Sequence, residues 1–204
     1  MLVDNDALLK LSAYDLFEEA LGCLHFIPQQ VYILATAKYK LLPAKSRLKL
    51  CKEEEVADRL EAIIASVNEF SEEQIINPEI IDTLLDYQGI DAGEALLIAY
   101  AIQIQQSLLL TGDKKALDAL TAIALENITV QLRNRICVLE VLFLKMIETD
   151  FPHIQLKVRS KPGVDTTMSF IFGRSLPGTR ESALDGLRSH ITHMKELGNN
   201  LLMD

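Results

Sequence analysis

Three acidic residues that lie far apart in the chain have surroundings that favour joint chemistry. Asp4 follows the apolar residues 1–3, Glu94 lies at the start of an alanine-rich helical pattern, and Asp113 follows the apolar run 107–111. Carboxylates that crowd together repel one another unless a cation lies between them. Carboxylate oxygens with open water positions are ligands that suit Mg²⁺ or Mn²⁺. Such a centre lowers the pKa of a bound water and can hold the oxygens of a phosphodiester.

The elements around these acids should bring them together. Residues 92–106 are predicted to form a helix of ~20 Å, at ~1.5 Å per residue. Residues 107–111 are predicted to form a buried strand that runs back over ~16 Å, at ~3.3 Å per residue. In a parallel sheet, Asp4 and Asp113 would both lie at the carboxyl edge, where ligand sites of open α/β sheets form. We therefore expect Asp4, Glu94 and Asp113 to converge.

Helix capping is the alternative interpretation of each acid. Asp4 or Asp6 could cap the first helix, Asp91 and Glu94 have the spacing of a capping box, and Asp113 could cap the helix that follows it. Three caps placed at one sheet edge nevertheless favour the metal interpretation.

The rest of the pattern alternates helices with very short apolar strands, which is typical of an α/β fold with a parallel sheet. Strands are expected at 1–3, 24–27 and 107–111. Helices are expected at 7–22, 29–42, 53–67, 78–89, 92–106 and from 114 onward. The alternation ends near residue 130, and helices are expected at 132–147 and 179–197. A helix is also favoured at 166–172, although the β-branched and aromatic residues there allow a strand. We therefore expect a domain over 1–130 and an α-rich C-terminal extension, 131–204, packed on it.

Composition and charge limit the class of protein. The chain has 204 residues, a net charge of −9 and 49% hydrophobic residues, so disorder is not expected. No apolar run reaches the ~18 residues of a membrane span, and the acidic start does not fit a signal peptide. Cys23, Cys51 and Cys137 are widely spaced and fit reduced thiols of a cytoplasmic protein. The negative charge argues against a protein that coats nucleic acid, but not against an enzyme with a local basic patch.

A basic segment could provide that patch. Residues 20–52 contain no acid, whereas 38–52 contain six Lys or Arg residues. One interpretation is that this segment contacts an RNA backbone, with Lys45, Arg47 and Lys49 as candidates. The alternative is a solvated helix face. Arg133 and Arg135 admit the same two interpretations.

Four segments occur in order along the chain: MLVDNDALLKL (1–11), FIPQQVYILA (26–35), GEALLIAYA (93–101) and LLLTGDKKAL (108–117). Together they resemble the PIN-domain family of metal-dependent ribonucleases over roughly residues 1–125. The family begins with an apolar strand, an Asp and an aliphatic helix, as in MLVDNDALLKL (1–11). It continues with an i-P-x-x-V stretch, as in FIPQQVYILA (26–35). An acid then opens an Ala-rich helix, and a later strand ends in T-x-D. GEALLIAYA (93–101) and LLLTGDKKAL (108–117) are similar to these last two motifs.

The resemblance implies a PIN-like three-layer α/β/α fold with a central parallel sheet. It implies hydrolysis of single-stranded RNA by a centre in which Asp4, Glu94 and Asp113 hold Mg²⁺ or Mn²⁺, with no other cofactor. The family includes toxins of bacterial toxin–antitoxin pairs, so an antitoxin-like protein and a second copy of the chain are further partners to consider. No membrane partner is expected.

One departure from the family leaves alternatives open. The family usually has a Glu shortly after the i-P-x-x-V stretch, where this chain has Leu34. Asp6, Asp91, Asp118 or one of the residues 53–55 could substitute for it, or the chain could be a PIN-like binding module that has lost catalysis.

A haloacid-dehalogenase-like phosphatase is a further alternative. Asp4-x-Asp6 imitates its nucleophile and acid, and Asp113 with Asp118 imitates its last acidic motif. However, Ala7-Leu8 replaces the usual Gly-Thr.

Overall fold

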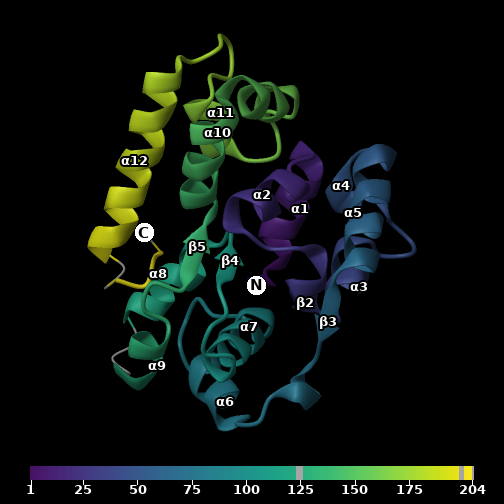
Figure 1. Ribbon diagram of the computed structural model, residues 1–204. Helices are drawn as coiled ribbons and strands as arrows, with labels where there is room; N and C mark the ends of the chain where they lie inside the picture. Colours follow the sequence, from purple (N-terminus) through teal and green to yellow (C-terminus); the bar gives the residue numbers. More distant parts are fainter. Residues whose placement is uncertain (123–125, 198–199, 204) are drawn as a thin grey trace.

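A five-stranded sheet forms the centre of the computed structural model, which describes residues 1–122, 126–197 and 200–203 (Figure 1). The strands are β1 (Leu2–Val3), β2 (Tyr32–Leu34), β3 (Asn68–Phe70), β4 (Leu109–Thr111) and β5 (Ile136–Val138). They lie in the order β3-β2-β1-β4-β5, and every neighbouring pair is parallel. The predicted α/β fold with a central parallel sheet is therefore confirmed.

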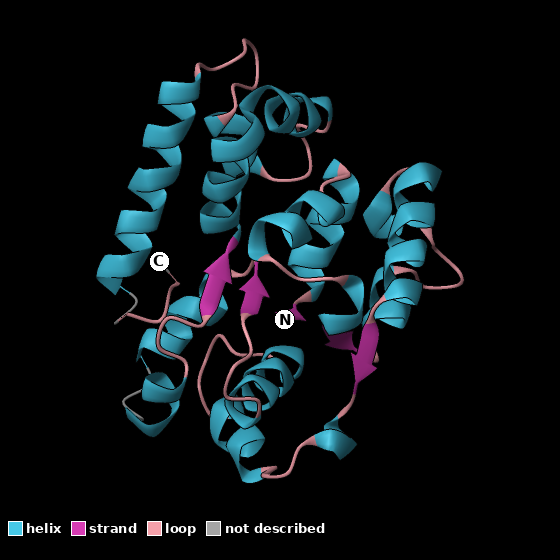
Figure 2. Ribbon diagram, viewed as in Figure 1, coloured by secondary structure: helices cyan, strands magenta, loops and turns pink. Residues whose placement is uncertain are grey.

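Helices surround the sheet (Figure 2). In chain order they are α1 (Asn5–Tyr14), α2 (Phe17–Leu24), α3 (Ala37–Leu41), α4 (Leu48–Cys51), α5 (Glu54–Ser66), α6 (Glu79–Leu85), α7 (Ala92–Gln103), α8 (Lys114–Ala122), α9 (Glu126–Gln131), α10 (Leu139–Ser160), α11 (Thr166–Ile171) and α12 (Arg180–Leu197). Short 3₁₀ turns lie at Pro28–Gln30 and Glu72–Gln74. Within the described residues, no helix combines the length and the apolar character needed to cross a membrane.

The strand order divides the helices between the two faces of the sheet. The chain moves from β1 to β2 and β3 in one direction, and then crosses back past β1 to reach β4 and β5. Because crossovers between parallel strands are right-handed, the helices between β1 and β3 and those between β3 and β5 lie on opposite faces. The packing agrees with this, since α1 contacts α5 while α7 contacts β1 and β4.

The region before β2 differs from the sequence prediction. No strand forms at 24–27, because α2 extends to Leu24 and Pro28 starts a 3₁₀ turn. The helix predicted at 29–42 is also wrong, since β2 occupies 32–34 and only α3 is helical. Tyr32 and Ile33 are aromatic and β-branched, which favours the strand. The third strand, β3, was not predicted.

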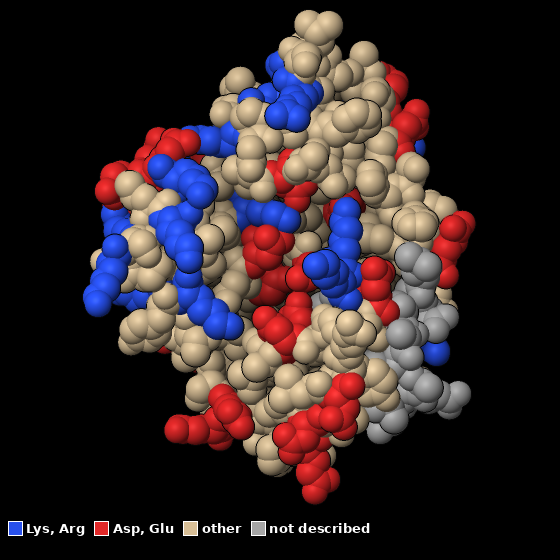
Figure 3. All heavy atoms as spheres, turned by 180° about the vertical axis from the view of Figure 1, so that it is seen from behind, with Lys and Arg blue, Asp and Glu red and all other residues tan. Residues whose placement is uncertain are grey.

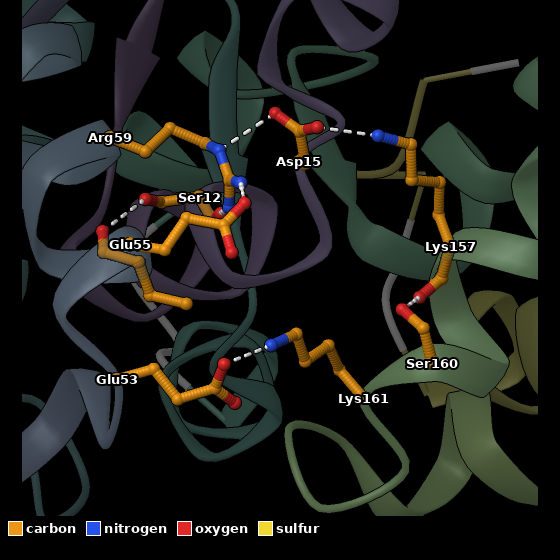
Figure 4. A network of polar contacts seen from close by, with 9 residues as sticks. Ser12, Asp15, Glu53, Glu55, Arg59, Lys157, Ser160 and Lys161 are labelled. Carbon is orange, nitrogen blue, oxygen red and sulfur yellow. Dashed lines mark hydrogen bonds and ion pairs between the residues drawn. The ribbon is translucent and has the colours of Figure 1, made fainter.

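The helix predicted at 7–22 is two helices, because the chain turns at Asp15. Asp15 has a left-handed φ of 57°, and its N–H ends α1 by donating to main-chain carbonyls of that helix. Its carboxylate then pairs with Arg59 of α5, at 2.7 Å, and with Lys157 of α10 (Figure 4). The side chain of Asp15 therefore links the end of α1 to α5 and α10. Gly22, the predicted end, lies inside α2, and His25 ends that helix in a left-handed conformation.

The segment 131–204 includes part of the sheet. Residues 136–138 form the edge strand β5 rather than the predicted helix over 132–147, and α10 starts directly after it. The α10 helix packs on α1, α2 and α12, and Leu202 forms a parallel bridge with Ile136. The helices predicted at 166–172 and 179–197 are confirmed as α11 and α12. Asp165 caps α11, with its Oδ1 2.9 Å from the N–H of Met168.

Candidate metal centre

The sheet order places Asp4, Glu94 and Asp113 around one pocket. Because β1 and β4 are neighbours, Asp4 and Asp113 follow adjacent strands at the carboxyl edge, and α7 begins beside them with Glu94. All three line a pocket of about 150 Å³, which we call the acidic pocket. Its lining residues are Asp4, Asn5, Asp6, Leu34, Lys40, Asp91, Gly93, Glu94, Leu97 and Asp113. The structure therefore brings the three predicted acids together.

Asp4 is buried and held from two sides. Its Oδ1 accepts the N–H of Ala7 at 2.6 Å, and its Oδ2 accepts the N–H of Gly112 at 3.0 Å and the hydroxyl of Thr111. Burial raises the pKa of Asp4 from 3.8 to about 6, although these hydrogen bonds oppose the rise. Asp4 is thus a fixed carboxylate that would become less costly to ionise beside a cation.

Thr111 is the threonine of the T-x-D motif, and its hydroxyl connects two of the predicted acids. Its hydroxyl donates to Asp4 and accepts the N–H of Asp113 at 3.0 Å. One side chain at the end of β4 therefore fixes Asp4 and orients the loop that carries Asp113.

Glu94 and Asp113 are in direct contact. A side-chain hydrogen bond joins them, and burial, followed by the charges of Asp91 and Asp113, raises the pKa of Glu94 from 4.5 to about 7. Two carboxyl groups can share a hydrogen bond only when one of them keeps its proton. The two carboxyl groups therefore lie at a place where a divalent cation would relieve their repulsion.

The capping interpretation is also correct for these acids. Asp4 caps α1, and Asp113 accepts the N–H of Lys115 at 2.7 Å at the start of α8. Asp91 and Glu94 form a reciprocal capping box, with Glu94 Oε2 2.7 Å from the N–H of Asp91 and Asp91 Oδ1 2.9 Å from the N–H of Glu94. Each of these acids lies at the start of a helix, and each of these helices starts at the same sheet edge. The acids therefore cap their helices and also lie close to one another.

Two further acids and one amide complete the polar lining. Asp6 and Asp91 both face the pocket, and Gly112 permits the position of Asp6, because a Cβ at Gly112 would lie 2.1 Å from Asp6 Oδ2. Asn5 also lines the pocket, and its buried Oδ1 has no hydrogen-bond partner in the structure. Of the proposed substitutes for the missing acid, Asp6 and Asp91 thus lie at the pocket, whereas Asp118 and the residues 53–55 do not line it.

Leu34, at the end of β2, lines the pocket where the resemblance would place a Glu. It is buried, so this wall of the pocket is apolar.

The donor set fits Mg²⁺ or Mn²⁺ in its chemistry. Carboxylate oxygens and a free amide oxygen are the hard ligands that these ions take, and the elevated pKa values of Asp4 and Glu94 mark negative charge in need of compensation. Among the residues that the structure describes, no group of three or more acid, His or Cys side chains is arranged so that it could already hold a metal ion. Ligation would require Glu94 to turn away from the main-chain N–H of Asp91.

Two of the six cations in the basic segment, Lys38 and Arg47, pair with acids of a neighbouring helix. Arg47 pairs with three acids of α5: Glu54 at 2.6 Å, Asp58 at 2.7 Å and Glu61 at 3.0 Å. These acids have the i, i+4, i+7 spacing of one helix face, a signal that the sequence contained. Lys45 and Lys49 are exposed. On the face shown in Figure 3, acidic side chains gather near the middle, and a band of Lys and Arg lies beside them over α3 and α4.

Arg135 has a structural role. Its guanidinium donates to the carbonyls of Ile104 at 2.6 Å and Ser107 at 3.0 Å, and also to that of Ala101. These bonds join the end of α7 to the start of β4, and thus fix the two elements that carry Glu94 and Asp113.

No family model matches this chain, and neither a curated protein nor a solved structure has significant similarity to it.

Proposed function

We propose that this chain is a PIN-like, metal-dependent endoribonuclease that hydrolyses phosphodiester bonds of single-stranded RNA. The observation that carries the proposal is the meeting of Asp4, Glu94 and Asp113 in one pocket at the carboxyl edge of a parallel sheet. The three residues come from separate elements, and the raised pKa of Glu94 beside Asp91 and Asp113 indicates a repulsion that a cation would relieve. In this proposal all three are ligands of Mg²⁺ or Mn²⁺.

The side chains of the pocket have distinct tasks in this proposal. When bound, the ion would lower the pKa of a water molecule and neutralise charge on the phosphate. Asp4 is held by three donors and acts as a rigid ligand. Glu94 and Asp113 would also hold the ion, which would relieve the repulsion between their carboxylates. The buried Oδ1 of Asn5 and the carboxylates of Asp6 and Asp91 are available to ligands of the ion, such as water.

Calorimetric titration with Mn²⁺ tests the centre. Wild type and Asp4→Asn are compared with Asp86→Asn, which removes the same charge from an exposed acid after α6 that does not line the pocket. We expect Asp4→Asn to bind Mn²⁺ at least ~10-fold more weakly than wild type, and Asp86→Asn to bind it normally. Equal binding by all three proteins would reject this centre.

Incubation of labelled single-stranded RNA with Mn²⁺ tests the activity. We expect slow cleavage by wild type, because Leu34 leaves the centre one acid short, and none by Asp113→Asn. Metal binding without cleavage would favour the second candidate, a PIN-like binding module, for which the buried Leu34 is the specific observation.

The geometry argues against the phosphatase alternative. A dehalogenase-like mechanism would require Asp4 to attack phosphorus and become phosphorylated. Asp6, which would act as the acid, is paired with Lys10 at 2.7 Å. Trapping of an acyl phosphate on Asp4 would overturn this argument.

A further inference from the structure

Lys40 is the basic residue among the described residues that line the acidic pocket. It belongs to α3 and is exposed. Within the described part of the chain, its side chain has neither an ion pair nor a hydrogen bond to a protein group. Lys38, on the same helix, instead pairs with Glu61 at 3.4 Å. The fold therefore leaves the Lys40 ammonium uncommitted, whereas the ammonium of Lys38 is paired with an acid.

Gly93 leaves room for the Lys40 ammonium at the lip of the pocket. A Cβ at Gly93 would lie 3.5 Å from Lys40 Nζ and 3.2 Å from both Leu34 Cδ1 and Asp91 Oδ1. The ammonium, the Leu34 side chain and the Asp91 carboxylate thus approach the same point above the first turn of α7. Lys40 therefore places a positive charge near both the apolar wall and one carboxylate of the pocket.

We infer that Lys40 binds the phosphate of the RNA strand that enters the acidic pocket. This inference rests on the proposed function. A phosphodiester that approaches the pocket meets five carboxylates, of Asp4, Asp6, Asp91, Glu94 and Asp113, and their combined charge repels it. An ammonium on a flexible stem at the lip of the pocket attracts the phosphate as a point charge. Lys40 thus supplies positive charge on the side where Leu34 provides no ligand for a second cation.

Binding of a fluorescein-labelled single-stranded RNA tests the inference by anisotropy, with Ca²⁺ in place of Mn²⁺ to prevent cleavage. Lys40→Gln is compared with Lys38→Gln, which makes the same charge change on the same helix away from the pocket. We expect Lys40→Gln to bind the RNA ~10-fold more weakly, with a slope of log affinity against log salt shallower by about 0.7. Lys38→Gln should resemble wild type, and Lys40→Arg should retain the wild-type slope.

Mn²⁺ calorimetry on the same variants separates phosphate binding from an effect on the metal. Removing a positive charge near the carboxylates should leave Mn²⁺ affinity unchanged or increase it. Equal RNA affinity and equal slopes for Lys40→Gln and Lys38→Gln would overturn the role of Lys40, while cleavage by wild type would leave the nuclease proposal standing. A Lys40-dependent slope without cleavage would support Lys40 and reject the nuclease. If wild type does not bind the RNA, both are rejected.

Discussion

Replacing Glu94 with Gln removes the carboxylate whose ionisation the acidic pocket opposes most directly. The rise of its pKa from 4.5 to about 7 corresponds to at most about 3.4 kcal/mol, at about 1.4 kcal/mol per pKa unit. Glu94 is only half-buried, so water screens part of this cost, and we expect Glu94→Gln to raise the free energy of unfolding by about 1–2 kcal/mol. The Gln oxygen can still accept the N–H of Asp91, and its amide can donate to Asp113.

The free energy of unfolding that Glu94→Gln adds should increase as the pH rises. Because the pKa of Glu94 is higher in the folded protein, the folded state binds the proton more tightly than the unfolded state does. Wild type therefore loses stability as pH rises from 4.5 to about 7, and the Gln variant lacks this loss. The variant should match wild type near pH ~4 and exceed it near pH ~8.

Urea unfolding in EDTA at both pH values measures the effect. Glu73→Gln, an exposed acid of the second 3₁₀ turn, is the control and should change stability by less than about 0.5 kcal/mol. At a Mn²⁺ concentration ~100-fold above its dissociation constant, wild type should gain about 2.7 kcal/mol, which reverses the order. If Glu94→Gln is less stable than wild type at high pH without metal, the argument from carboxylate repulsion is wrong.

Gly112→Ala should destabilise the chain by about 1–3 kcal/mol in thermal unfolding, because the new Cβ would lie 2.1 Å from a carboxylate oxygen. Gly22→Ala, with no atom within 4 Å of the new Cβ and a place inside α2, should instead stabilise it by about 0.5–1 kcal/mol; the same sign for both variants would contradict the clash. If Lys45 and Lys49 contact RNA, replacing both with Gln should flatten the salt slope of RNA binding by about 1.4. Adding Arg47→Gln should flatten it little further, since that guanidinium is already paired, and a further drop of about 0.7 would show that RNA displaces its partners.

The convergence of the three acids could be predicted because it depends on fixed dimensions. The helix that starts near Glu94 and the strand that ends before Asp113 run in opposite directions and have known rises per residue. Because their lengths are similar, the strand returns the chain to nearly the level of Glu94. Parallel strands also end at one edge, which places Asp4 beside Asp113. Local sequence contains the lengths and the shared edge, whereas the pairing of β1 with β4 is a long-range contact that the structure supplies.

The short strands could not be predicted in the same way. A strand of three residues is too short to show a clear alternation, and β5 is in addition buried throughout. β5 runs directly into the apolar pattern of α10, and so resembles the start of a longer helix. The pairing of Arg47 could not be predicted for a different reason. Its partners lie on α5, outside the basic segment, so the charges of the segment itself do not indicate them.

The central place of β1 in the sheet affects the order in which the fold can form. Asp4 and Thr111 are in contact although they lie 107 residues apart. One edge of β1 pairs with β2, and the other edge stays uncovered until β4 has been synthesised. At ~5–20 residues per second, that separation corresponds to about 5–20 s of synthesis. During this time one edge of β1 is open to pairing with other chains. The acidic pocket therefore cannot be complete until residue 113 has been synthesised, and contacts so distant in sequence favour slow folding.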